Sequence, residues 1–341
     1  MKPKQLNTAT LHRLDVHLRQ ATNILCITHQ RLDHDAITSV LLVRHILDTY
    51  YQKNASVIIQ DTLSSLLLDT PLPTVASATT VDPESIIDTR KYDCIVMVDT
   101  PSIARCIRSN ETVEELYART IVFDHHTTTP PHKTLFTINQ QRSSAAEEVF
   151  ATFFELIPNL TNDTTASTLT QIGILADTNR FMYSGSLSRE TFQLFGMLYE
   201  SSPINIEKVY YSTIQSTRHS LSVLKHIIDN MVLYDSFFYT YIDPTFLEKN
   251  TLTAEDEEAA RTMFLVVHAR SIPGINWGCL IRKLDGNNEW NVSFRAIHGT
   301  KNVLALARKL GGGGHTYAAG ATFSANNLDD AIQQVRTVIK N

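Results

Sequence analysis

Residues 24–40 read ILCITHQRLDHDAITSV, and this stretch decides the fold of the first part of the chain. It begins with a short, continuously apolar run, Ile24–Thr28, which is typical of a strand buried on both faces of a parallel sheet. An apolar pattern of helical spacing follows from Asp35 to Tyr50, and a second β-branched run spans Ser56–Gln60. Strand, helix and strand in this order predict a βαβ unit.

The same rhythm continues to about residue 200. Apolar runs at Cys94–Val98 and Ile121–Phe123 are short and bounded by polar residues, as expected for two more strands of the sheet. Helical patterns follow at 144–157 and 163–176. We therefore predict an α/β domain over residues 1–200, with a parallel sheet at its centre.

A smaller second domain is predicted after a connecting segment. An amphipathic pattern with few breakers runs from about 204 to 232, which favours a linking helix within residues 201–235. Beyond it, the patterns alternate between strand and helix and indicate an α+β domain over 236–341. The expected strands are Phe237–Ile242, Gly278–Lys283 and Trp290–Ala296, and the expected helices are 254–268, 302–310 and 328–340.

Composition limits the class of protein. The chain has 341 residues, of which 43% are hydrophobic and 19% charged, so we expect a soluble globular protein and exclude a disordered or fibrous one. The absence of a signal-like start and of a run of about 18 apolar residues argues against any membrane association. Four widely spaced cysteines, without a Cys-x-x-Cys pair, favour a reducing, cytoplasmic compartment.

Charge is unevenly distributed along the chain. The net charge is −5, yet residues 261–320 contain eight Lys or Arg and only two acidic residues. A basic stretch of this kind is usually a solvated surface, but it would also suit a short anionic substrate. The second domain is therefore the basic part of an acidic protein.

Aspartate and histidine residues follow three of the predicted strands, and one more aspartate follows a helical run. Since the carboxyl ends of parallel strands meet at one edge of the sheet, we expect these side chains to converge. Taken singly, each could instead be a helix cap, a turn residue or a structural histidine. They are His29, Asp33, Asp35, Asp99, Asp124, His125, His126 and Asp177.

Carboxylates mixed with imidazoles suit Mn²⁺ or Mg²⁺ and lack the thiolates of a structural zinc site. Several clustered aspartates would repel one another at neutral pH without a cation. Two ions about 3.5–4 Å apart that share a bridging carboxylate would use them all, and such pairs serve phosphoester hydrolysis.

A second signal is the sequence GGGGH at Gly311–His315, which follows a helical pattern. Glycines let backbone N–H groups approach a phosphate closely, and a neighbouring His or Arg supplies positive charge. A flexible turn is the alternative interpretation. Arg295, in the predicted strand NVSFRA, could lie beside this loop and contact a phosphate, although an arginine on a surface strand is ordinary.

Together these residues resemble a known family. His29-x-x-x-Asp33-x-Asp35, Asp99, Asp124-His125-His126 and Asp177 are similar to the four motifs of the DHH phosphoesterases in order and spacing. The segment GGGGH-x-x-AAG and the strand with Ser293-Phe294-Arg295 resemble the DHH-associated domain of the nanoRNase/pAp-phosphatase group. The resemblance covers nearly the whole chain.

The resemblance implies a role for each matching position. One metal ion would be held by His29, Asp33 and Asp99, and the other by Asp35, Asp99, His125 and Asp177, with Asp99 as the bridge. His126 would lie near the scissile phosphate, and Asp124 would orient the histidine pair. A further phosphate of the substrate would be bound by Arg295, Gly312, Gly313, Gly314 and His315.

The chain also departs from the family pattern at positions that are not expected metal ligands. Leu32 stands where Pro is usual, Thr38 and Asn179 stand where Gly is usual, and Ala145-Ala146 replaces a Thr-Ser type pair. His34 is an additional imidazole without an expected role. These changes put substrate preference in more doubt than the type of reaction.

The resemblance implies a two-metal phosphoesterase, with Mn²⁺ expected and Mg²⁺ as the alternative ion. Its substrates would be short oligoribonucleotides, cleaved to mononucleotides, or pAp, cleaved to AMP. Three alternatives stay open: a phosphodiesterase acting on cyclic dinucleotides, a manganese inorganic pyrophosphatase or exopolyphosphatase-like hydrolase, and a non-catalytic nucleotide-binding module. A homodimer is also left open.

Overall fold

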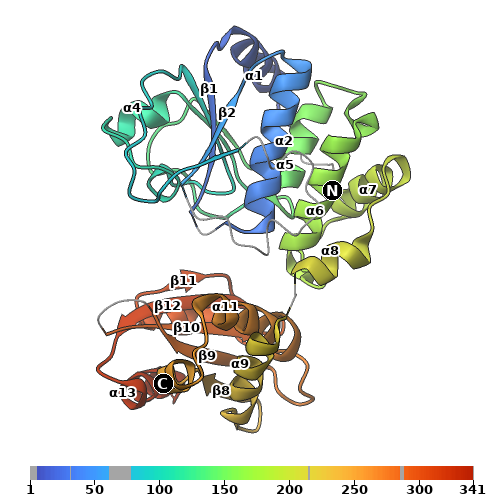
Figure 1. The fold of residues 1–341 in the computed structure, drawn as a ribbon. Helices are drawn as coiled ribbons and strands as arrows, with labels where there is room; N and C mark the ends of the chain where they lie inside the picture. The colour runs from blue at the N-terminus through green and yellow to red at the C-terminus, as the bar shows by residue number, and fades with distance from the viewer. Residues whose placement is uncertain (1–5, 31, 61–77, 214–215, 285–287, 341) are drawn as a thin grey trace. The chain divides into compact units, whose positions relative to one another are not determined.

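The computed structural model describes residues 6–30, 32–60, 78–213, 216–284 and 288–340. The chain divides into two compact units, Met1–Thr213 and Ile214–Asn341, which are described separately here (Figure 1). Among the described residues, no helix combines the length and the apolar composition needed to cross a lipid bilayer.

Unit 1 is built on a six-stranded sheet in the spatial order β3-β2-β1-β4-β5-β6. Every neighbouring pair of strands is parallel, which confirms the predicted α/β class. All residues of β1 and β4 are buried, because helices cover both faces of the sheet. The strands are β1 (Ile24–Thr28), β2 (Ser56–Ile59), β3 (Thr79–Thr80), β4 (Cys94–Val98), β5 (Thr120–Phe123) and β6 (Phe136–Ile138).

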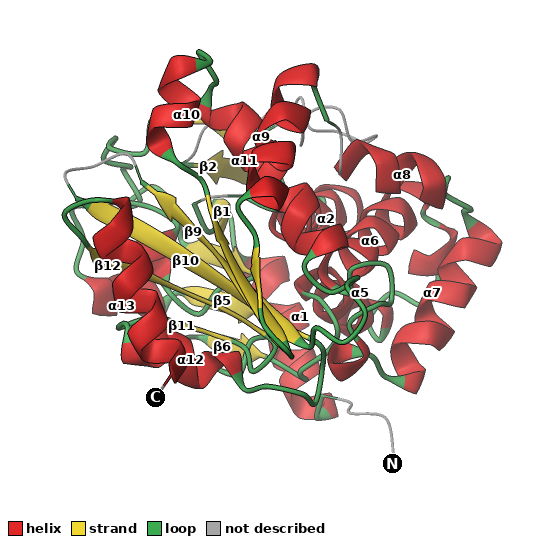
Figure 2. Cartoon of the chain, turned by 90° about the horizontal axis from the view of Figure 1, so that it is seen from below, coloured by secondary structure: helices red, strands yellow, loops and turns green. Residues whose placement is uncertain are grey.

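Most of the helices of unit 1 pack into one core on one face of this sheet (Figure 2). They are α1 (Thr8–Gln20), α2 (His34–Tyr50), α5 (Ala145–Phe154), α6 (Thr164–Asp177), α7 (Arg189–Ser201) and α8 (Ile206–Thr213). A smaller core on the other face includes α4 (Val113–Ala118). Helix α2 is buried on almost every side, since it lies between the sheet and α5 and α6.

The strand order places the expected site at a reversal in the topology. From β1 the chain moves outward to β2 and β3 and then returns to β4 on the other side of β1. Thr28 at the end of β1 pairs with Val98 at the end of β4, so the residues that follow them begin side by side. Ligand sites of open α/β sheets form at such a reversal, beyond the carboxyl ends of the strands.

Unit 2 contains a mixed sheet in the order β11-β12-β10-β9-β8-β7, in which only β8 and β9 are parallel neighbours. One face packs against α12 and α13, and the β8–β9 part of the other face packs against α9 and α11. The strands are β7 (Val232–Leu233), β8 (Phe237–Tyr241), β9 (Trp277–Lys283), β10 (Glu289–Ala296), β11 (Gly313–Gly314) and β12 (Ala318–Ser324). The helices are α9 (Arg218–Asp229), α10 (Pro244–Lys249), α11 (Ala254–Met263, continued by a π-helix to His268), α12 (Val303–Lys309) and α13 (Leu328–Lys340).

The single linking helix predicted within 201–235 is wrong. Helix α8 ends at Thr213 and belongs to unit 1, whereas α9 starts at Arg218 and packs against α11 of unit 2. Thr217 caps the start of the second helix, because its hydroxyl accepts from the backbone N–H of Ser220 at 3.0 Å. In return, the Ser220 hydroxyl accepts from the backbone N–H of Thr217 at 2.8 Å. The amphipathic pattern continues through both helices, and among the described residues the Thr217 cap marks the start of the second.

Candidate metal centre

Five segments of unit 1 bring the predicted aspartates and histidines together. His29 follows β1, Asp99 follows β4, and Asp124, His125 and His126 follow β5. The other three come from helix ends: Asp33 caps α2, Asp35 lies in its first turn, and Asp177 is the last residue of α6. Residues far apart in sequence therefore meet beyond the carboxyl edge of the sheet, as predicted.

Three groups of these side chains have geometry that could hold a metal ion, with the ligand atoms of each group within 4.8 Å of one another. Asp99 is shared by two of the groups, and His125 is also shared by two. The groups are His29–Asp33–Asp99, Asp35–His125–Asp177 and Asp99–His125–His126. Shared ligands make this one continuous cluster.

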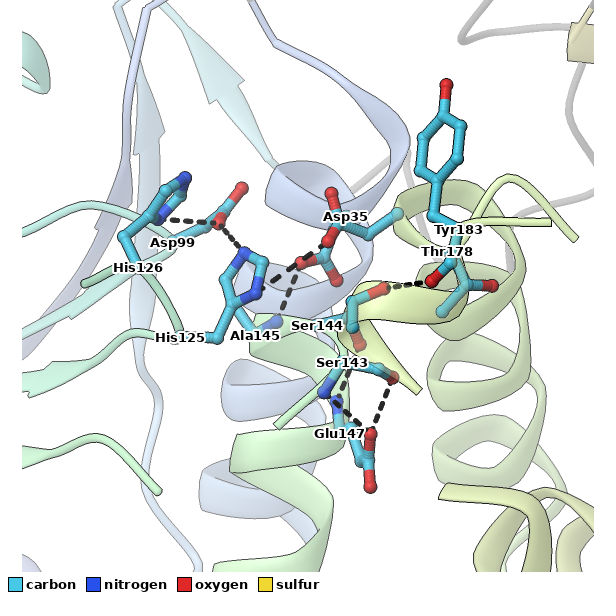
Figure 3. A network of polar contacts seen from close by, with 12 residues as sticks. Asp35, Asp99, His125, His126, Ser143, Ser144, Ala145, Glu147, Thr178 and Tyr183 are labelled. Atoms are coloured by element: carbon cyan, nitrogen blue, oxygen red, sulfur yellow. Dashed lines mark hydrogen bonds and ion pairs between the residues drawn. The ribbon is translucent and has the colours of Figure 1, made fainter. Parts of the chain in front are cut away.

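Asp99 lies at the centre of the cluster and is almost completely buried, at 3% exposed. Its Oδ2 lies 3.3 Å from His29 Nε2. Its Oδ1 lies 3.3 Å from His125 Nε2 and 3.8 Å from His126 Nδ1 (Figure 3). Within the described structure, Oδ1 forms no hydrogen bond. A buried carboxylate oxygen that faces imidazole nitrogens and accepts no hydrogen bond is suited to be a metal ligand.

The backbone at Asp99 is also unusual. Its φ of +60° lies in the left-handed region, which a residue other than glycine seldom adopts. Strain of this kind is kept where the surrounding structure holds it in place, and it directs the Asp99 side chain into the cluster.

The electrostatics of the cluster favour a cation. Burial, with the charges of Asp99 and Asp177, raises the pKa of Asp35 well above its ordinary value. Burial likewise raises the pKa of Asp177 to about 6, against the opposing charge of His125. Burial would also raise the pKa of Asp99, but the neighbouring His125 and His29 hold it far below the ordinary value. Asp99 therefore stays ionised, and without a metal the buried negative charge is offset by protons on Asp35 and on the neighbouring histidines.

We expect the apparent affinity for Mn²⁺ to rise with pH between about 6 and 9. Although burial opposes it, Asp99 raises the pKa of His29 to about 9, so His29 carries a proton at neutral pH. The ion that binds His29 must displace the proton on that ring, and near pH 6 the ion that binds Asp177 must displace a proton from that carboxyl, so binding of both ions costs less as the pH rises. Calorimetric titration at pH 7 in two buffers of different ionisation enthalpy measures the protons released.

A His45→Gln variant is the control for that titration. His45 lies further along α2 and contacts Asp163 at 2.7 Å, outside the cluster. On binding Mn²⁺, the His45→Gln variant should release the same number of protons as the unchanged protein. An affinity independent of pH would contradict the expectation.

His126 and Asp124 form a pair at the edge of the cluster. The Asp124 Oδ1 atom lies 2.8 Å from His126 Nδ1 and also accepts from the backbone N–H groups of His125 and His126, at 2.9 and 3.3 Å. These bonds fix the carboxylate within its own turn, and the carboxylate then sets the orientation of the His126 ring. The resemblance implied this arrangement for Asp124.

Asp35 has partners that the sequence did not predict. Its Oδ2 accepts from the N–H of Ala145 at 2.7 Å, and its Oδ1 accepts from the N–H of Ala146 at 3.1 Å. The family usually has other side chains at these two positions, but the bonds come from the backbone, so the alanines preserve them. The pattern Ser144-x-x-Glu147, a helix-start signal, could have indicated these donors.

Two other departures from the family pattern have a simple structural reason. Asn179 has a φ of +47°, and asparagine is among the residues that best tolerate the left-handed region where glycine is usual. Leu32 packs against the main core of unit 1.

The predicted phosphate-binding residues lie in unit 2. Arg295 is half-buried in β10, and its Nη1 donates to the carbonyl of Phe294 at 2.9 Å. The imidazole of His315 is stacked on the ring of Tyr317, with 5.8 Å between the ring centroids. These contacts hold both side chains at one end of the sheet.

The glycine run has local structural reasons at three of its four positions. Gly311, at φ +75°, ends α12, and Gly312 donates back to the carbonyl of Ala307 at 2.9 Å. A Cβ on Gly312 would lie 2.1 Å from the Gly320 oxygen, and Gly314 has a φ of +127°. At Gly313 a Cβ would meet no atom within 4 Å. Steric crowding in the described structure therefore does not explain a glycine at Gly313.

Comparison with known proteins agrees with this architecture. The model of the DHH family, N-terminal domain, matches residues 23–179, and the model of the DHHA1 domain matches residues 266–341. The bifunctional oligoribonuclease and PAP phosphatase NrnA of Bacillus subtilis is 25% identical over 323 residues, which are 93% of this chain and 95% of that protein. The NrnA protein of Mycoplasma pneumoniae is 31% identical over 172 residues, which are 50% of this chain and 49% of that protein.

A solved structure shares the fold. The crystal structure of an exopolyphosphatase-related protein from Bacteroides fragilis aligns with a TM-score of 0.83 and 21% identity, covering 99% of this chain and 97% of the other. The two family models together match most of the chain, and they match its two units in the order expected from the resemblance. This chain belongs to the DHH family of phosphoesterases, with a DHH N-terminal domain followed by a DHHA1 domain.

Proposed function

We propose that this protein is a two-metal phosphoesterase that hydrolyses short oligoribonucleotides to mononucleotides and pAp to AMP. The observation that carries the proposal is the buried Asp99 carboxylate, whose two oxygens face His29 on one side and His125 on the other. A carboxylate in this position can bridge two ions. The names of the similar NrnA proteins support the choice of substrates.

In this proposal His29, Asp33 and Asp99 hold one Mn²⁺ ion. The second ion is held by Asp35, Asp99, His125 and Asp177. The bound pair would supply an activated water molecule and would offset the charge of the phosphoryl oxygens.

His126 acts beside this pair as a proton donor to the leaving oxygen. Its Nδ1 faces Asp124, which directs the opposite ring nitrogen, Nε2, outward. The contact with Asp124 fixes the orientation of the ring, so that in this proposal Nε2 delivers the proton to the leaving oxygen.

Arg295 and His315 supply positive charge for a second phosphate of the substrate, next to the glycine loop. Gly313 supports this role, because steric crowding in the described structure does not explain a glycine there. A close approach by a phosphate would explain it. The preference for very short substrates would then follow from a fixed number of phosphate positions.

Product analysis tests the proposed function directly. The purified protein is incubated with Mn²⁺ and separately with pApA, short RNA, pAp, cyclic di-AMP and pyrophosphate. Mononucleotide or AMP release from pApA, RNA or pAp supports the proposal. Cleavage of pyrophosphate alone, or of cyclic di-AMP alone, would assign another branch of the family, and tight dinucleotide binding without turnover would indicate a non-catalytic module.

We expect Arg295→Ala to raise KM for dinucleotides by about 10- to 100-fold, because a charged contact to a phosphate is lost. Hydrolysis of a small phosphodiester with a single phosphate should change much less, since it has no second phosphate. Steady-state kinetics on both substrates measure the difference. Lys283→Ala, which removes an exposed charge at the far end of β9, is the control and should leave both values unchanged. Equal effects of Arg295→Ala on the two substrates would argue against a second phosphate site.

A further inference from the structure

The carboxylate of Asp35 is held at both oxygens by the first turn of α5. Ala145 donates its backbone N–H to Oδ2 at 2.7 Å (Figure 3). Ala146 donates its backbone N–H to Oδ1 at 3.1 Å, and the Ser39 hydroxyl donates to the same oxygen at 3.3 Å. The N-terminus of a helix carries partial positive charge, which favours an anion there. The orientation of Asp35 therefore depends on where α5 begins.

The start of α5 is in turn fixed by Glu147. Its Oε2 accepts from the N–H of Ser143 at 3.0 Å, from the hydroxyl of Ser143 at 2.6 Å and from the hydroxyl of Thr191 at 3.0 Å. Ser144 caps the same turn by accepting from the N–H of Glu147 at 3.0 Å. Glu147 thus joins three segments: the loop before α5, α5 itself and the first turn of α7.

Burying the carboxylate of Glu147 at the start of α5 costs free energy of desolvation. Its side chain is only 1% exposed, and the fully buried Glu148 lies next to it in sequence. Arg142 approaches Glu147 Oε1 at 3.7 Å and offsets part of the negative charge. A buried carboxylate loses its hydration, so its hydrogen bonds must replace it. Glu147 receives these hydrogen bonds from Ser143 and Thr191. Ser143 directly precedes Ser144, the cap residue of α5.

Helix α6 packs closely against both Asp35 and the first turn of α5 at Gly173. A Cβ on Gly173 would lie 2.7 Å from Asp35 Oδ1 and 2.4 Å from the Cβ of Ala146. There is therefore no space for the carboxylate and the first turn of α5 to shift together toward α6. A displaced α5 would change the direction in which Asp35 presents its remaining lone pairs.

We propose that Glu147 is a positioning residue that acts through the first turn of α5 to aim Asp35 at the Asp35–His125–Asp177 group. The inference rests on the metal-dependent function proposed above. The other group, His29–Asp33–Asp99, is built from the ends of β1 and β4 and the start of α2. Loss of Glu147 should therefore weaken the binding of one ion and leave the binding of the other unchanged.

Calorimetric titration of the whole protein with Mn²⁺ tests this difference without measuring activity. We expect the unchanged protein to bind two ions. In Glu147→Ala the ion at the Asp35–His125–Asp177 group should bind about 10- to 100-fold more weakly, the effect typical of losing a group that orients a ligand. The other ion should keep its affinity, and a high Mn²⁺ concentration should restore most of kcat.

Thr152→Ala is the matched control. Thr152 is a buried residue of the same helix, about two turns along α5 from Ala145, and its hydroxyl donates to the carbonyl of Glu148 at 2.8 Å. This variant loses a buried hydrogen bond in α5 and should lower thermal stability, yet both Mn²⁺ affinities should stay unchanged. If it weakens the same ion as Glu147→Ala, general loosening of α5 explains the effect and the proposal is overturned.

Thr191→Val keeps the test informative if Glu147→Ala fails to fold. The substitution preserves the shape of the side chain and removes one hydroxyl donor to Glu147. Thr191→Val should weaken the binding of the same ion by a smaller factor. Equal weakening of both ions, or of neither, in every folded variant would contradict the positioning role. An unchanged protein that binds no Mn²⁺ would instead refute the proposed function.

Discussion

Asp99→Asn is expected to reduce Mn²⁺-dependent phosphoester hydrolysis on the order of a thousand-fold or more. The variant keeps the shape of the side chain but removes the charge that His29 and His125 face. A neutral amide cannot bridge two cations, and its NH₂ group would point at an imidazole nitrogen or an ion. The loss should appear in kcat on every substrate of the panel, and calorimetry should show that fewer than two ions bind.

Asp93→Asn is the control for this substitution, because Asp93 precedes the same strand that Asp99 follows. Asp93 accepts from the backbone N–H groups of Thr22 and Asn23, at 2.8 and 3.0 Å, at the amino end of β4. Its loss should reduce stability and leave kcat unchanged. Unchanged activity in Asp99→Asn would defeat the assignment of Asp99 as the bridging ligand.

Gly173→Ala should have the second largest effect, on both stability and activity. The added Cβ would lie 2.4 Å from the Cβ of Ala146 and 2.7 Å from Asp35 Oδ1, closer than packed atoms can approach. Because α2, α5 and α6 pack together here, no neighbour can yield cheaply. We expect a loss of about 1–3 kcal/mol in the free energy of unfolding and a marked fall in kcat as Asp35 is displaced.

Gly196→Ala provides the comparison, since Gly196 also lies inside a helix of unit 1. A Cβ there meets no atom within 4 Å, so α7 gains the higher helix propensity of alanine without a clash. Its stability should rise by up to about 1 kcal/mol, with kcat unchanged. Thermal unfolding and steady-state kinetics of both variants decide the matter: a Gly173→Ala protein as stable and active as Gly196→Ala would show that the contact with Asp35 is unimportant.

The sequence determined the central strands of unit 1 and the edge of the sheet at which the site forms. The predicted bounds of β1 and β4 agree with the structure, because strands buried on both faces are continuous apolar runs. The residues that follow those strands were also predictable as neighbours, since parallel strands end at the same edge. Asp99 and His29 are the clearest examples.

Local patterns could not determine where elements meet across the fold. The amphipathic period continues through α8 and α9, so the sequence suggested one helix where the cap at Thr217 starts a second. The glycine run suggested that all four glycines serve phosphate binding. In the structure, Gly311 ends α12 with a positive φ, and Gly312 packs too closely against β12 for a side chain to fit. The error over the linking helix comes from contacts that periodicity does not encode.

What the sequence by itself determined is therefore the fold class, the family pattern and the set of charged side chains at the carboxyl edge of the sheet. Only the tertiary structure decided how those side chains are held. The backbone of Ala145, which lies 110 residues after Asp35, donates to its carboxylate, and Gly173 makes room for that contact. Backbone donors and missing side chains leave little trace in residue type, because their effect depends on which helices pack side by side.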